Sequence, residues 1–269
     1  MQMTPSCSFV CDSQRCSDTE EISRDVWLKF KISAPRNGLQ LNPDKTAIIW
    51  FGSKASLAKL KVDIRPSTVL RDLGVRPDSD LSIRDHISRT ASSCFFHLRR
   101  LRQLRGVVCC STMQRLVSAL VLSRLDYCNA VLSGLPSTTL DPLRRVLNAA
   151  IRLVAGLGPR DHVTEQIKTL HWLPIKYRIN FKLCVMMHAA VTGQCLQYMP
   201  DIAHPLLILP GRNRLRGAAS RQFDIPRTRT VFGERAFSAA GTREWNTLPQ
   251  DITDITNREA FKRARKTLF

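Results

Sequence analysis

Between residues 81 and 192, apolar side chains recur every three or four positions, and this spacing is the strongest constraint on the fold. It is the period of an α-helix with one buried face. Four helices are predicted, at 84–105, 113–132, 140–154 and 175–191, with a short one at 163–170. Glycine follows each of the four long stripes within two residues. The short connection between the second and third favours antiparallel neighbours.

The segments on either side of this region have other patterns. Residues 1–36 show no sustained period and are predicted to be a poorly ordered or unrelated leader. Residues 37–80 are predicted to hold short strands, one at 47–51 and a second starting at Val69. Residues 193–269 are predicted to be a loop-rich basic extension ending in a helix over 257–268. The predicted fold class is α+β, mainly α: a small β segment, a helical domain over 81–192, and the extension.

The charge favours a polyanionic partner. Lys and Arg number 41 against 22 Asp and Glu, which gives a net charge of +19, and hydrophobic residues make up 43%. This composition provides a core and excludes a wholly disordered chain. No apolar run reaches the ~20 residues of a membrane span, and the first ten residues lack the features of a signal peptide. We expect an intracellular protein, nuclear or cytoplasmic and not secreted, that makes no membrane contact and binds nucleic acid or another polyanion.

One predicted helix places arginines opposite its apolar stripe. Over 84–105, Arg89, Arg99 and Arg100 lie on the far side and Arg102 flanks the stripe. Such a helix presents arginines to a phosphate backbone, although an ordinary solvated face is the alternative. A second arginine cluster, between Arg212 and Arg229, is a competing candidate. The predicted cap of the following helix is Ser111 or Thr112.

Residues typical of catalytic or metal sites are scattered. The chain has no glycine-rich phosphate loop, no His-Glu-x-x-His and no Gly-x-Ser-x-Gly. Its six histidines are isolated, and its nine cysteines lack zinc spacing and are expected to be buried or idle thiols. The aspartates at 63, 72, 78 and 80 straddle turns, where Asp hydrogen-bonds locally. We predict no metal site.

Eight short sequence segments, called phrases below, indicate a family relationship that composition alone does not. In order they are Asn37–Thr46, Arg71–Val75, Cys94–Arg102, Ser123–Asn129, Asn148–Leu153, His171–Pro174 with Arg178-Ile179, Pro226–Thr230 and Trp245–Pro249. In this order and spacing they resemble the C-terminal part of the reverse transcriptase of jockey-like non-LTR (LINE-type) retrotransposons. The resemblance covers about residues 37–269.

The resemblance implies an anatomy. The phrase Leu41–Thr46 matches motif D at the end of the polymerase palm, and Lys45 matches its lysine, which helps to protonate the departing pyrophosphate. Leu73–Val75 matches a hairpin that supports the primer end. The helices after Asp80 match the thumb, which grips the template–primer duplex, and the remainder matches the C-terminal extension.

The catalytic core of the family is absent. Those polymerases hold two Mg²⁺ ions with an aspartate and a Tyr-x-Asp-Asp turn, and no Tyr-x-Asp-Asp occurs in this sequence. The tryptophan usually found before motif D is Ser33 here. We therefore expect a truncated RNA-directed DNA polymerase fragment that is not an enzyme on its own and has no cofactor. It would bind RNA, DNA or their hybrid through Lys45, Arg89, Arg99, Arg100 and Arg102. A basic helical protein with a protein partner, and a non-functional product of a decayed element, are the alternatives.

Overall fold

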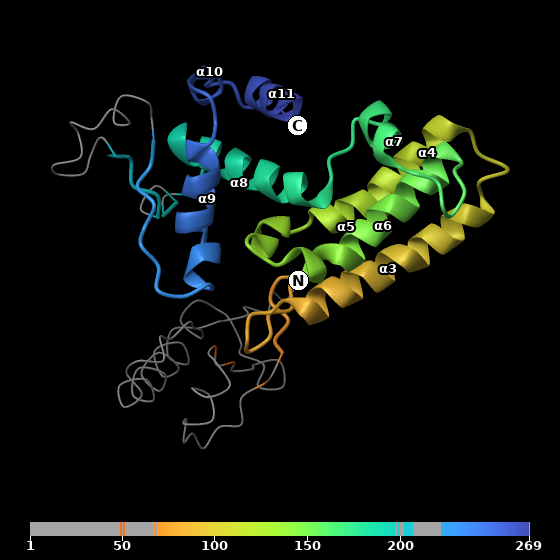
Figure 1. Ribbon diagram of the computed structural model, residues 1–269, viewed down its shortest axis with the longest axis horizontal. Coiled ribbons are helices and arrows are strands. Elements are labelled where there is room, and N and C mark those ends of the chain that lie inside the picture. Colours follow the sequence, from red (N-terminus) through yellow and green to blue (C-terminus); the bar gives the residue numbers. More distant parts are fainter. Residues whose placement is uncertain are drawn as a thin grey trace, which may run out of the picture. The chain divides into compact units, whose positions relative to one another are not determined.

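The computed structural model describes residues 49, 51, 67, 69–196, 198–199, 202–206 and 222–268. These residues are mainly helical, and no β-strand occurs among them (Figure 1). The chain divides into two compact units, 1–88 and 89–269, and the division falls within helix α3 (Arg84–Gln103). The predicted leader and, apart from Ile49 and Phe51, the predicted strand over 47–51 lie outside the described residues.

Residues 69–78 form a tight hairpin. Asp72 and Val75 exchange both backbone hydrogen bonds, at 2.9 and 2.8 Å. Between them, Leu73 and Gly74 have φ of 44° and 85°. Two successive positive φ values define the type I′ turn, whose twist matches that of an antiparallel pair. A turn of this kind therefore fixes the register of the whole hairpin.

The hairpin does not extend into the short strand predicted from Val69. The next bonded pair after the turn is Leu70 and Pro77, where the Leu70 N–H donates to the Pro77 carbonyl at 3.1 Å. Pro77 has no N–H to donate in return. The pairing therefore consists of isolated antiparallel bridges, and the predicted β component is wrong for this described segment.

Asp78 connects the hairpin to the start of α3. Its Oδ1 accepts a hydrogen bond from the Ile83 N–H at 3.1 Å, and its Oδ2 accepts one from the Ser82 hydroxyl. Arg76 and Asp85 form an ion pair of 3.6 Å in the same unit. The local hydrogen-bonding role predicted for an aspartate in this turn is thus confirmed for Asp78.

Helix α3 confirms the first predicted helix and its buried face. The predicted stripe is buried throughout, at Ile87, Ala91, Cys94, Leu98 and Leu101. The helix ends at Gln103, slightly before the predicted end. The Cys94 thiol donates to the Val121 carbonyl at 3.9 Å, so α3 lies against the second helical stretch.

The second predicted helix, 113–132, is not continuous. It consists of α4 (Cys110–Val117), a π-helical turn (Ser118–Leu122), α5 (Ser123–Asp126) and a 3-10 turn (Asn129–Leu132). The residue that precedes α4 is Cys109, so the prediction of a Ser111 or Thr112 cap is wrong.

Side-chain hydrogen bonds explain the π-helical turn. The Ser123 N–H donates to the Ser118 carbonyl five residues earlier. The Ser123 hydroxyl bonds the Ala119 carbonyl, and the Arg124 Nε donates to the Leu120 carbonyl at 3.1 Å. Serine and arginine thereby satisfy carbonyl groups that the wider turn leaves without their α-helical partners.

The remaining predicted helices are confirmed. They are α6 (Ser137–Ala155), the short α7 (Thr164–Thr169) and α8 (Ile175–Val191). Helix α6 ends at Gly156, whose φ of 76° suits a glycine after a helix. Helix α6 packs against both α4 and α8.

The C-terminal segment is more helical than its sequence pattern predicts. It contains α9 (Phe237–Asn246), α10 (Gln250–Thr253) and α11 (Arg258–Thr267), of which only the last was predicted. Helices α9 and α11 both pack against α8 (Figure 1). A Cβ added to Gly241 would lie 3.0 Å from Phe237 Cε2 on α9 and 3.2 Å from Met187 Sδ on α8, so α9 and α8 are closely packed at this position.

An aromatic stack forms the core of this C-terminal segment. The ring centroids of Trp245 and Phe261 are 5.8 Å apart, and those of His188 and Phe261 are 4.3 Å apart. His188 is buried, and its Nε2 lies 2.8 Å from the Ile255 carbonyl, to which it must donate. Burial lowers the pKa of His188. This histidine is therefore part of the core.

Candidate nucleic-acid interface

The exposed face of α3 carries the four arginines predicted from this helix. Arg89, Arg99, Arg100 and Arg102 are all exposed. At about 100° per residue, Arg89, Phe96 and Arg100 fall within about 20° of one line, opposite the buried stripe. By the same geometry Arg99 lies about 80° to one side and Arg102 about 140°, near the edge of the stripe. The helix thus groups Arg89 and Arg100 and sets Arg102 apart.

Phe96 holds Arg100 in place on this face. The ring is 48% exposed, and the Arg100 Cζ lies 5.6 Å from its centroid. A guanidinium held over a ring by a cation–π contact keeps N–H groups free for an oxyanion. An exposed arginine ordered in this way loses less side-chain entropy when it binds a phosphate.

Helix α5 adds a cation that the sequence alone did not indicate. Partial burial lowers the pKa of His97, and the charges of Arg124 and Arg100 lower it further, so both arginines act electrostatically on the same ring. The bond from Arg124 Nε to the Leu120 carbonyl fixes the side chain. We call the exposed arginines Arg89, Arg99, Arg100, Arg102 and Arg124 the α3–α5 basic face, in which Arg102 lies at the edge, beside the buried stripe.

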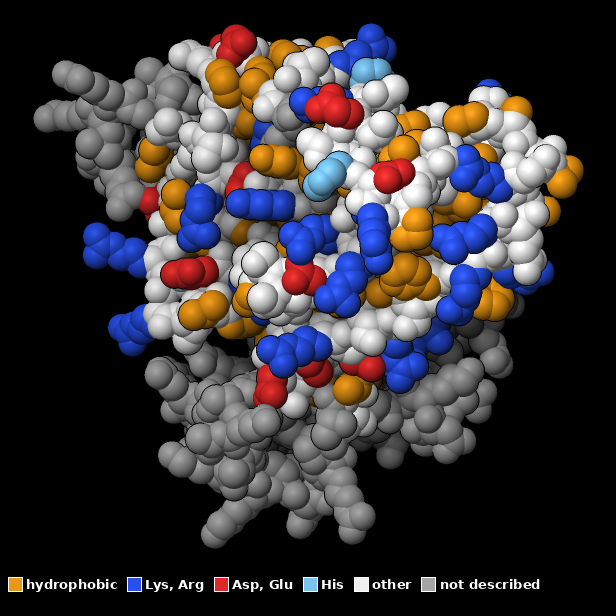
Figure 2. All heavy atoms as spheres, turned by 45° about the vertical axis from the view of Figure 1, so that its right-hand side comes forward, with side chains coloured by type: hydrophobic (Ala, Val, Ile, Leu, Met, Phe, Trp, Pro, Cys, Tyr) orange, Lys and Arg blue, Asp and Glu red, His pale blue; other side chains and the backbone are white. Residues whose placement is uncertain are grey.

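Four of the five arginines of the α3–α5 basic face lack a compensating carboxylate in the described part of the chain. Within the described residues, no ion pair forms at Arg99, Arg100, Arg102 or Arg124. Figure 2 shows many Lys and Arg side chains exposed on one face of the molecule, with acidic side chains scattered between them. Arg227 and Arg229 of the competing cluster are also exposed, whereas Lys45 and the arginines from 212 to 221 lie outside the described residues.

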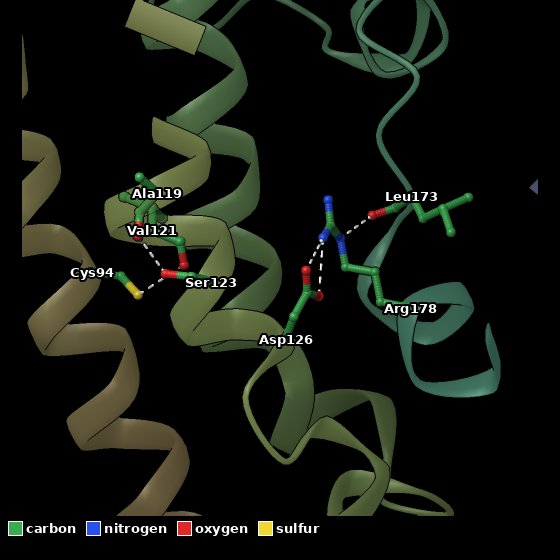
Figure 3. A network of polar contacts seen from close by, with 7 residues as sticks. All are labelled: Cys94, Ala119, Val121, Ser123, Asp126, Leu173 and Arg178. Atoms are coloured by element: carbon green, nitrogen blue, oxygen red, sulfur yellow. Dashed lines mark hydrogen bonds and ion pairs between the residues drawn. The ribbon is translucent and has the colours of Figure 1, made fainter. Parts of the chain in front are cut away.

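An ion pair near Arg124 joins two of the eight sequence phrases, Ser123–Asn129 and Arg178-Ile179. Arg178 Nη1 donates to both carboxylate oxygens of Asp126, at 3.0 and 2.9 Å, and Arg178 Nε donates to the Leu173 carbonyl at 2.6 Å (Figure 3). The Arg178 side chain is only 10% exposed. Asp126 follows Arg124 by two residues, so the pair holds the α5 end of the basic face against α8.

The cysteines that the structure describes are free thiols, and they differ in their surroundings. Cys94 and Cys184 are buried, as predicted, and burial raises the pKa of Cys94 to about 11. Cys109 is exposed, and hydrogen bonds from Ser111 and Thr112 lower its pKa to about 7. Cys109 is thus a reactive thiol that its sequence spacing did not reveal.

Two further findings apply to the part of the chain that the structure describes. It contains no group of three or more His, Cys, Asp or Glu residues placed to hold a metal ion. None of its helices combines the length and apolar character needed to cross a membrane.

Comparison with protein-family models, curated proteins and solved structures gives no match for this chain. The function of the chain is therefore inferred from the geometry above and from the eight sequence phrases.

Proposed function

We propose that this chain binds RNA, DNA or an RNA–DNA hybrid through phosphate contacts on the α3–α5 basic face. The observation that carries the proposal is this group of exposed arginines, of which Arg99, Arg100, Arg102 and Arg124 have no carboxylate partner among the described residues. A phosphate backbone supplies closely spaced negative charges, and arginine binds them with two N–H groups at once. Binding of this kind depends little on base sequence.

We further propose that the chain derives from a jockey-like non-LTR retrotransposon reverse transcriptase, as a palm remnant and a thumb. The order of the hairpin over 69–78 and the helices that follow agrees with this anatomy. In this proposal the thumb-like helices hold a duplex, and Lys45 lies at the palm. The sequence has no Tyr-x-Asp-Asp, so the proposed activity is binding without polymerisation and needs no cofactor.

A salt titration tests the proposed interface. Affinity for a duplex should fall steeply with salt because each neutralised phosphate releases condensed counterions. Replacing Arg99, Arg100 and Arg102 by alanine should weaken binding to every sequence. It should also flatten the plot of log affinity against log salt by up to about three units. Arg124→Ala should flatten it by about one unit more.

A matched variant separates local contacts from total charge. Arg144, Arg145 and Lys168 are exposed and lie on α6 and α7, so their replacement by alanine removes the same charge elsewhere. This control should keep the wild-type slope. An unchanged slope in the α3 variant would refute the proposed interface, and a loss confined to a variant of Arg227 and Arg229 would assign binding to the competing cluster. Equal affinity for poly-glutamate would instead favour an acidic protein partner.

A further inference from the structure

Phe96 is an exposed aromatic ring within the α3–α5 basic face. It is 48% exposed, because the buried stripe of α3 lies on the opposite side of the helix. Its neighbours one turn away along α3 are all polar: Ser92 and Ser93 toward the N-terminus, and Arg99 and Arg100 toward the C-terminus. No hydrophobic cluster on α3 therefore accounts for this ring, and the two serines are too short to cover it.

Two contacts hold the Phe96 ring in one orientation. The ring of His97 meets it edge to face, with the centroids 5.5 Å apart and the planes at 77°. The Arg100 Cζ lies 5.6 Å from its centroid, whereas a group stacked flat on the ring would lie about 3.5–4.0 Å away. Arg100 therefore braces the ring without covering it. A ring held in this way loses little side-chain entropy when a ligand stacks on its open face.

An unpaired base of a nucleic-acid strand matches this arrangement. Every base has an aromatic face and is attached through its sugar to a phosphate, and proteins bind single strands with aromatic rings next to cations. Helix neighbours three or four residues apart have Cβ atoms about 5–6 Å apart. Arg99 and Arg100 are therefore close enough to bind phosphates of the strand whose base lies on Phe96. Inside a duplex, neighbouring bases cover both faces of each base, so Phe96 would find no free face there.

We propose that Phe96 stacks on an unpaired base, so that the α3–α5 basic face recognises a single-stranded segment of nucleic acid. This inference rests on the proposed function, which supplies the phosphate contacts, and it adds a contact that a duplex interior cannot make. The contact tolerates any base sequence because all bases have an aromatic face.

The test compares two single strands that carry the same phosphates. Fluorescence anisotropy measures the affinity of the full chain for labelled oligo-dT and for its abasic analogue, which keeps the sugar–phosphate backbone and lacks the bases. The ratio of the two affinities reports contacts to bases. The variant Phe96→Leu removes the aromatic face and keeps an apolar residue that suits a helix. The control is Phe232→Leu, because Phe232 is 47% exposed and lies outside the basic face, before the 3-10 turn Gly233–Arg235.

We expect the wild-type chain to bind oligo-dT at least about fivefold more tightly than the abasic strand. Phe96→Leu should lower this ratio by about fivefold or more, and Phe232→Leu should keep it. Since Phe96→Leu also removes the contact with Arg100, a variant that weakens both strands by the same factor would show a loss of arginine positioning alone and would overturn the proposal. The proposal is also overturned if the wild-type chain binds the two strands equally or not at all, or if Phe232→Leu lowers the ratio as much as Phe96→Leu does.

The salt dependence separates this inference from the proposed function. Stacking releases no counterions, so Phe96→Leu should keep the wild-type slope of log affinity against log salt. The alanine variant of Arg99, Arg100 and Arg102 should flatten that slope. A flattened slope in the arginine variant together with equal wild-type affinity for the two strands would refute the stacking and leave the phosphate contacts standing. An unchanged slope in the arginine variant would refute both, because the stacked base needs the phosphate contacts.

Discussion

Replacing Asp126 by asparagine should destabilise the second unit by about 1–2 kcal/mol. Hydrogen bonds to charged groups contribute about 1.5–3 kcal/mol each. Asp126 is 47% exposed, so water screens its ion pair with Arg178. The summed contribution of the two hydrogen bonds to stability is therefore reduced to about 1–2 kcal/mol. The loss arises because Arg178 is only 10% exposed and its guanidinium would keep few acceptors, with the Leu173 carbonyl among them. Asparagine preserves the size of the side chain, so packing changes little.

A double-mutant cycle isolates this energy. In an Arg178→Met background the buried charge is gone, and Asp126→Asn should then cost less than about 0.3 kcal/mol. Urea unfolding followed by far-ultraviolet circular dichroism measures the four free energies. Asp141→Asn is the matched control: Asp141 pairs with Arg144 at the same 2.9 Å, but Arg144 is 66% exposed, so the change should cost less than about 0.5 kcal/mol. Equal costs of Asp126→Asn in both backgrounds would refute the reasoning.

Two other features give separate tests. Alkylation of Cys109 by iodoacetamide should rise with a midpoint near pH 7, the pKa set by its hydrogen bonds to Ser111 and Thr112, while buried Cys94 stays unmodified. The double variant Ser111→Ala with Thr112→Ala should raise the pH midpoint of Cys109 alkylation, which peptide mass spectrometry measures. An unchanged midpoint in this variant would contradict the role given to the two hydrogen bonds. Gly156→Ala should cost at least about 1 kcal/mol because alanine is strained at a φ of 76° and its methyl group would displace the Arg105 side chain. Gly106→Ala, which meets open space and needs no positive φ, should leave the urea midpoint unchanged or raise it, and equal effects of the two substitutions would count against the backbone explanation.

Sequence periodicity predicts α3, α6 and α8 because each has an apolar face that begins and ends with clear signals. The bounds of α8, Ile175–Val191, agree with the predicted range. Helix α9 is harder to predict since much of its buried face is small: Ala239, Ala240, Gly241 and Thr242 are all buried. Small residues produce a weak apolar period, although they are what allows α9 to approach α8 closely.

The candidate interface is predictable only within one helix. The 3.6-residue period places Arg99 and Arg100 on the exposed side of α3 without any knowledge of the fold. It cannot show that Arg124 joins them, because this depends on how α5 packs. The Asp126–Arg178 pair spans 52 residues, and no local pattern connects residues that far apart.

The π-helical turn at Ser118–Leu122 determines which way Asp126 points. A π-turn holds one residue more than an α-turn, and one residue corresponds to about 100° of rotation about the helix axis. Leu120, Val121 and Leu122 are all apolar, so the packing of this stretch alone would accept another rotation. The contact between Asp126 and Arg178 does depend on this rotation, because Arg178 lies on one side of the helix only. Deleting a single residue here would therefore let the chain continue as an unbroken α-helix and carry the carboxylate away from its partner. The phase of the helix, and with it the position of the Asp126 carboxylate, therefore depends on the number of residues in an uncharged segment.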